Sequence, residues 1–213
     1  QNKVAGEKIM TTQMNKAAGG LTAVAVGFGM VASANAGSLK ITQATPATLD
    51  NKVSFKYSFG PDTFSYTAKE VMFKAVNTAN PSDWFYTFCT DIGVSIKFGQ
   101  TYEYNPVPFV PTPTHPNPAW TANGIQFAAE LYKSHLNEAI ANPVAGTGLQ
   151  LAIWEVLNDT TWDVTSGKFT AKDTLDNTAP VGAKPTDFTT AYLGQLSQVV
   201  PNYPGTYYQR SEE

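Results

Sequence analysis

Two residues in this sequence have side chains that can react with each other: Cys89, the sole cysteine, and Gln150. Trp154 and Leu157 follow Gln150 at i+4 and i+7, so a helix places all three on one face. That face is expected to point into the core, where an amide without hydrogen-bond partners costs about 1–3 kcal/mol. Cys89 lies at the end of an aromatic stretch, residues 84–90, which is apolar on both faces and predicts a central strand covered on two sides. Cys89 is also expected to point inward. We therefore predict that the two residues meet where this strand contacts the helix.

A thiolate beside a carboxamide has one notable reaction, attack on the amide carbon with loss of ammonia to form a Cys–Gln thioester. The reaction needs a lowered thiol pKa and donors for the oxyanion that develops on the carbonyl. The free amides at the start of a helix supply both, and we expect Thr147 to cap the helix of Gln150. Aromatic side chains around the pair would slow hydrolysis by excluding water, namely Trp84, Tyr86, Phe88 and Trp154.

Other interpretations of these residues stay open at this point. Cys89 is alternatively an inert buried thiol, the usual state of a free cysteine, or a partner in a disulfide between molecules. Gln150 is alternatively a core amide that binds a neighbouring backbone group. Asp91 either orients Gln150 and polarises an incoming amine or forms a turn. Trp154 is expected in the core under each interpretation.

Hydrolase and metal chemistry find less support. A Cys–His hydrolase would need His115, in a proline-rich stretch, or His135, late on a predicted helix, and neither has a sequence signature. Asp159 and Asp163 flank Trp162 in a polar loop, where calcium binding or solvated turn acids are both possible. We therefore predict that the protein is not an enzyme and that it binds no metal and no cofactor. Aromatic residues expected in loops are candidates for stacking on sugars: Trp120, Tyr207 and Tyr208.

The elements that must position the pair are strands followed by helices. Residues 39–107 predict strands, with clear alternation over residues 53–59 and 63–67, and further strands over 71–76, 84–90 and 101–107. The last strand runs into a proline-rich stretch, from Pro106 to Pro118, which is expected to be an extended loop and not a regular element. Helical spacing follows from Ile125 to Leu136, then around Gln150, then after Asp187 as an expected cap. A turn at Ser166–Phe169 predicts one more short strand. The fold class is α+β, an antiparallel β-sandwich or barrel-like sheet with about three helices.

The N-terminal 36 residues have the three parts of a secretory signal. Lys16 supplies the positive charge, residues 21–32 are uncharged and too short to span a membrane, and Ala34-Asn35-Ala36 is a small-x-small cleavage pattern. Residues 37–213 then form one exported domain without a spanning segment. A net charge of −3 and the lack of basic clusters exclude nucleic acid as a partner.

Phe88-Cys89-Thr90-Asp91 and the segment from Leu149 to Glu155, LQLAIWE, resemble the paired motif of bacterial surface thioester domains, which mostly have Tyr where this chain has Phe88. The resemblance implies that Cys89 and Gln150 are cross-linked with Trp154 beside them. It also implies an adhesin-like role, in which an amine or a sugar hydroxyl of a surface partner attacks the thioester.

The same segments, with Ser166–Phe169, resemble exported Gram-negative proteins that carry a C-terminal Pro-Glu-Pro sorting signal (PEP-CTERM). That tail is not in this sequence, which fits a chain that continues past Glu213. Thr, Asn and aromatic residues are plentiful, so the alternative function is a non-covalent structural or polysaccharide-binding protein of the cell surface or exopolysaccharide matrix. The residues do not indicate an oligomeric state.

Overall fold

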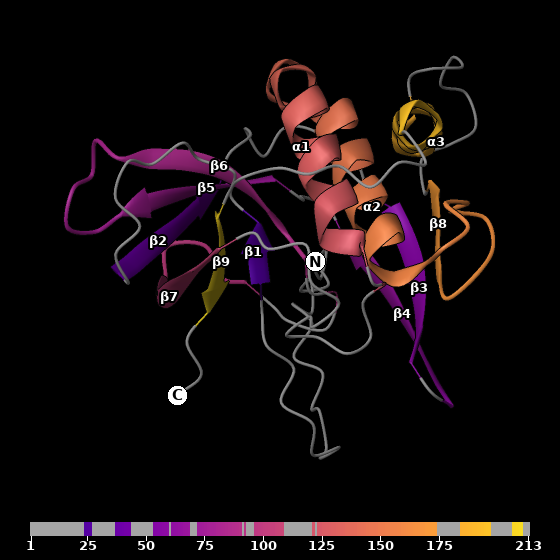
Figure 1. The fold of residues 1–213 in the computed structure, drawn as a ribbon, viewed down its shortest axis with the longest axis horizontal. Helices are drawn as coiled ribbons and strands as arrows, with labels where there is room; N and C mark the ends of the chain where they lie inside the picture. Colours follow the sequence, from indigo (N-terminus) through magenta and orange to yellow (C-terminus); the bar gives the residue numbers. More distant parts are fainter. Residues whose placement is uncertain are drawn as a thin grey trace, which may run out of the picture.

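A computed structural model describes the chain at residues 24–26, 37–43, 53–59, 61–68, 72–90, 92, 96–108, 121, 123–173, 184–196 and 206–210. Its strands form two antiparallel sheets beside three helices (Figure 1). The strands are β1 (Val24–Val26), β2 (Gly37–Gln43), β3 (Val53–Phe59), β4 (Asp62–Ala68), β5 (Met72–Asn77), β6 (Trp84–Cys89), β7 (Thr101–Pro108), β8 (Phe169–Asp173) and β9 (Thr206–Arg210). The helices are α1 (Gly124–Ala141), α2 (Pro143–Asn158) and α3 (Pro185–Gln195).

The first sheet has four longer strands in the order β6-β5-β2-β7. The hairpin β5–β6 pairs Ala75 with Phe85, and β2 pairs Ile41 with Ala75. The shorter β9 pairs with β7, and β1 pairs with both β9 and β6, which makes the sheet barrel-like. The second sheet has the order β4-β3-β8, with Phe55 opposite Ala171.

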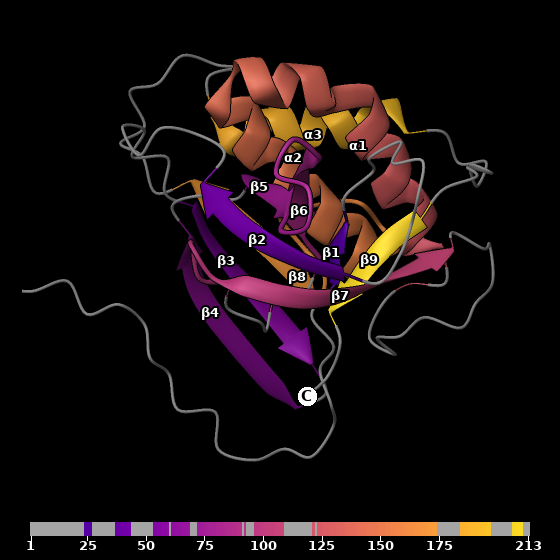
Figure 2. The same cartoon turned by 90° about the vertical axis from the view of Figure 1, so that its left-hand side faces the viewer.

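Helix α2 occupies the centre of the fold, with α1 on one side and α3 on the other (Figures 1 and 2). Every residue from Ala145 to Asn158 is buried, because the helix is apolar around most of its circumference and neighbours cover each face. Gly148 permits the close approach of α3, since a Cβ there would lie 2.5 Å from the Cβ of Phe188. The core extends from α2 to both sheets.

The structure confirms the α+β class with two antiparallel sheets and three helices in its described part. Predicted strands lie within two residues of those found, but β9 was not predicted, and it places Tyr207 and Tyr208 in a strand and not in a loop as expected. The aromatic stretch was expected to be covered on both faces, but Trp84 is exposed and burial begins at Thr87. Pro106 and Pro108 lie in β7, so the prediction that this stretch cannot form a regular element is wrong there. Residues 109–120 lie outside the described part.

Of the expected signal segment, the structure describes residues 24–26, which form β1 and pair with β6 and β9. The removal of residues 1–36 stays a prediction. No helix in the described ranges combines the length and the apolar character needed to cross a membrane.

Candidate functional site

The carboxamide of Gln150 contacts Cys89 directly through two hydrogen bonds. Its Oε1 accepts from the backbone N–H of Cys89 at 2.9 Å, and its Nε2 donates to the backbone carbonyl of the same residue at 2.6 Å. Gln150 is fully buried and Cys89 is 7% exposed. The two residues therefore meet at a strand–helix contact, as their sequence pattern predicts.

The carboxamide lies at the end of the β5–β6 ladder. Among the described residues, the last β5 pair joins Met72 to Phe88, and the opposite edge of β6 at Cys89 faces Ala25 of β1. Successive residues of an antiparallel strand direct their backbone N–H and C=O groups alternately to the two edges of the strand. The N–H of Asn77 donates to the carbonyl of Asp83, so every second residue after Asp83 directs these groups toward β5, and Cys89 is one of them. The Gln150 side chain thus continues the ladder of β5 by one amide.

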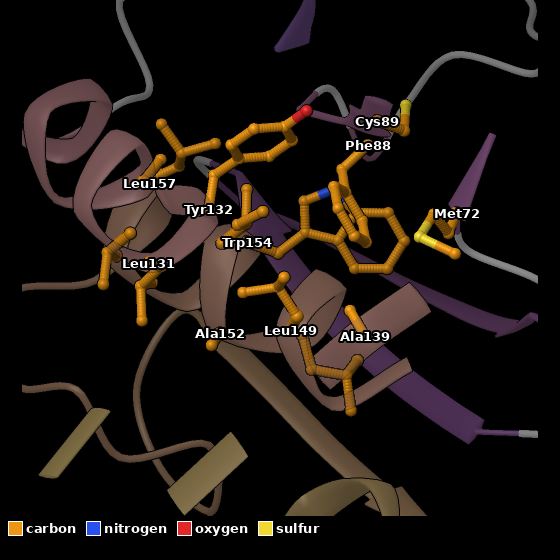
Figure 3. Close-up of a cluster of buried hydrophobic side chains, with 14 of the residues drawn as sticks. Met72, Phe88, Cys89, Leu131, Tyr132, Ala139, Leu149, Ala152, Trp154 and Leu157 are labelled. Carbon is orange, nitrogen blue, oxygen red and sulfur yellow. The ribbon is translucent and has the colours of Figure 1, made fainter. Parts of the chain in front are cut away.

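The two hydrogen bonds place the amide carbon of Gln150 beside the backbone of Cys89. A carboxamide that bonds both backbone groups of Cys89 lies near the hydrogen-bonding plane of the sheet, whereas side chains project out of that plane. Phe88 faces the helices, with its ring 6.0 Å from that of Tyr132, so Cys89 projects from the other face (Figure 3). The Gln150 Cδ therefore faces the Cys89 backbone, and the alternation of side chains along β6 places the sulfur on the side of the sheet away from the helices.

The start of α2 differs from the prediction and changes the source of the oxyanion donor. Asn142 caps the helix, accepting from Val144 N–H at 3.0 Å, and Pro143 occupies the first turn. Thr147, the expected cap, lies inside the helix and donates its hydroxyl to the Pro143 carbonyl. Gln150 is thus the eighth residue of the helix, away from the free first-turn amides. The donor to the Gln150 side-chain oxygen is instead the backbone N–H of Cys89.

Neighbouring helices hold the two elements in place. Tyr132 of α1 donates its hydroxyl to the Tyr86 carbonyl of β6 at 2.7 Å, which ties the helix layer to the strand of Cys89. On the other side, Thr189 of α3 donates to the carbonyl of Gly148 at 3.0 Å. Both bonds are within a few residues of the Cys89–Gln150 contact, so they limit the relative movement of strand and helix.

Trp154 lies in the core as expected. Its ring packs against Phe55 and Phe169, with centroids 4.8 and 6.0 Å away. Its indole nitrogen is buried without a hydrogen-bond partner among the described residues, and the same holds for the hydroxyls of Thr87 and Thr90 on and just after β6. Asp91, the other predicted supporting residue, lies outside the described residues.

Glu155 is a buried acid to which sequence reasoning assigned no role. Its side chain is fully buried, and burial raises its pKa to about 8, with further increases from the charges of Asp159 and Asp163. The nearby backbone N–H of Asp163 offsets part of this rise in the pKa, although neither carboxyl oxygen of Glu155 has a hydrogen-bond partner among the described residues. The sequence carried a signal for this residue, because Glu155 is the one charged residue in α2.

The candidate histidine and aspartates of the hydrolase and metal interpretations contact neighbouring parts of the fold. His135 stacks on Tyr192 of α3 at 3.9 Å, and burial lowers its pKa. Asp159 accepts from the N–H of Phe169, and Asp163 accepts from Thr165 and Ser166. In the part of the chain that the structure describes, no three acidic, His or Cys side chains are grouped to hold a metal. His115, Trp120 and the side chains of Tyr207 and Tyr208 lie outside that part.

Comparison with known proteins finds no matching family model, no similar curated protein and no similar solved structure. The features that bear on function are therefore the contact between Cys89 and Gln150 and the residues around it.

Proposed function

We propose that this chain is an exported surface protein in which Cys89 and Gln150 form an internal thioester for covalent attachment to a partner. The observation that carries the proposal is the pair of hydrogen bonds that fixes the Gln150 carboxamide against the backbone of Cys89. A buried amide needs partners, but many backbone groups would serve. Here the partner is the residue that carries the chain's sole thiol.

The first step is formation of the thioester. The sulfur attacks Cδ of Gln150, an S–C bond forms, and the carbonyl electron pair moves to Oε1, which the Cys89 N–H stabilises. The tetrahedral intermediate collapses, the C–N bond breaks, and the thiol proton leaves with Nε2 as ammonia. Burial of both residues keeps water from the product, because hydrolysis needs access to the same carbon.

The second step joins the partner. A neutral amine of a surface protein, or a hydroxyl of a polysaccharide, attacks the thioester carbonyl and forms an amide or ester with the former Gln150. The C–S bond breaks, and the sulfur takes up the proton that the nucleophile loses. The chain then remains attached to the partner by one covalent bond, and Cys89 is again a thiol.

Intact mass spectrometry of residues 37–213 tests the proposal. The wild type is expected to be one ammonia lighter than its sequence, and methylamine should add its own mass and expose a thiol that reacts with iodoacetamide. The matched control is Cys89→Ala, which keeps the backbone groups that Gln150 binds, and it should have full mass and ignore methylamine. A wild type of full mass, with a thiol already reactive in the native state, would refute the proposal.

A non-covalent polysaccharide-binding role is the second candidate, and one surface feature favours it. Trp84 is 44% exposed on β6, its ring is 5.4 Å from that of Tyr86, and the Lys74 ammonium lies 3.9 Å from its centroid. Exposed aromatic rings stack on the apolar faces of sugars. If this function is correct, Trp84→Ala releases the protein from exopolysaccharide in a sedimentation assay, whereas Cys89→Ala remains bound.

A further inference from the structure

The indole N–H of Trp154 is an orphaned donor in the interior of the fold. Trp154 Nε1 is buried and has no hydrogen-bond partner among the described residues. An indole nitrogen only donates, and a buried donor without an acceptor costs about 1–3 kcal/mol. Phe55 and Phe169 pack against the ring, so it is not free to turn toward a distant acceptor. A native core rarely keeps such a group without a reason.

The orphaned donor is next to the reacting amide. Trp154 follows Gln150 by four positions on α2, so the two side chains are neighbours on one helix face. Trp154 belongs to the same buried cluster as Phe88 and Cys89 at the end of β6, and Figure 3 draws the three side chains together. Trp154 and Phe88 lie on the helix side of this sheet, whereas Cys89 projects from the opposite side.

The direction of attack decides where the carbonyl oxygen moves. When a thiol adds to one face of an amide, the other substituents of the carbon bend away from the incoming sulfur. The Gln150 oxygen therefore moves out of the plane of the sheet toward the helix layer, where Trp154 lies. The oxygen gains negative charge at the same time, and one donor, the Cys89 N–H, already contacts it. Oxyanion sites generally supply more than one donor.

We propose that the Trp154 indole N–H is the second oxyanion donor of this site. This inference rests on the proposed thioester function. The indole binds the Gln150 oxygen when the Cys89 sulfur attacks and ammonia leaves, and binds it again when a partner amine attacks and the sulfur leaves. No proton passes through the indole in either step. Trp154 thus acts on the rate of both reactions, beyond its contribution to packing.

The test is Trp154→Phe, which removes the N–H and keeps an aromatic ring, compared with Trp162→Phe as the matched control. Trp162 packs on Phe127 at 4.7 Å and is not part of the contact between Cys89 and Gln150. Aminolysis by methylamine is followed by intact mass. We expect the Trp154 variant to form and to lose the thioester about 100-fold more slowly than wild type, the usual effect of removing one oxyanion donor. The Trp162 variant should react at the wild-type rate.

Each outcome separates the two proposals. A folded Trp154→Phe protein with wild-type rates overturns the donor role and leaves the thioester function standing. A wild type of full mass overturns both. If Trp154→Phe does not fold, the indole resonance of Trp154 in wild-type protein, observed by ¹H–¹⁵N NMR, decides the matter. We expect a downfield indole proton in the thioester form that moves after methylamine treatment, and an unchanged resonance would overturn the donor role.

Discussion

Glu155→Gln is expected to remove most of the pH dependence of stability above pH 5. The carboxyl group is fully buried on α2, and burial, with the charges of Asp159 and Asp163, raises its pKa from the ordinary 4.5 to about 8. The folded protein therefore keeps the Glu155 proton through neutral pH, whereas the unfolded chain releases it above about pH 4.5. Gln is the uncharged isostere of the protonated acid and has no proton to release.

The sign and the size follow from this difference in proton binding. The folded state holds more protons than the unfolded state between pH 4.5 and 8, so the free energy of unfolding falls as the pH rises through this window. The contribution is fully present below the unfolded pKa and is lost once the folded group ionises. The difference between a pKa of 4.5 and one of about 8, at about 1.4 kcal/mol for each tenfold change in proton affinity, sets an upper bound of about 5 kcal/mol.

Urea unfolding at pH values from 5.0 to 8.5, monitored by tryptophan fluorescence, measures this effect. Wild type should lose stability over the series, while Glu155→Gln should change by about 1 kcal/mol or less from this source. Glu103→Gln, on the exposed part of β7, is the matched control and should keep the wild-type slope. If Glu155→Gln has the same slope as wild type, the buried acid ionises normally and the reasoning fails.

Three further substitutions test the packing around the site. Gly148→Ala should lower the free energy of unfolding by about 1–3 kcal/mol, because the new Cβ would lie 2.8 Å from a backbone oxygen of α3; an unchanged melting temperature would contradict the close approach. Gly167→Ala should cost about 1–2 kcal/mol, since its φ of +106° disfavours a side chain and the Cβ would overlap the Asp159 carboxylate; urea unfolding measures this, and a neutral result argues against that loop geometry. Tyr132→Phe should cost about 0.5–1.5 kcal/mol by removing the bond from α1 to β6, and faster hydrogen exchange in β6 should accompany the loss; unaltered exchange would count against this bond.

The contact between Cys89 and Gln150 was predictable because each residue conflicts with its local pattern. An amide on an apolar helix face needs a partner, and a strand that ends in the sole cysteine offers one nearby in the fold. The α+β class was predictable for a related reason, since alternation and helical spacing are local properties. Element boundaries followed within a few residues, but α3 begins before Asp187, its expected cap, and α2 begins before Thr147. There Thr147 and Asn142 are both acceptable caps, and Pro143 decides in favour of the earlier start.

The sequence by itself determined which residues form the pair, because residue type and local periodicity specify a buried amide and a thiol without a disulfide partner. Only the tertiary structure decided how they meet. Which backbone groups Gln150 binds depends on where β5 ends beside β6, and strand register is set by pairing between distant segments. The isolation of the Trp154 N–H and the raised pKa of Glu155 also arise from neighbours on β3, β8 and the loop after α2. No local pattern encodes those distances, since they depend on the packing of the whole core.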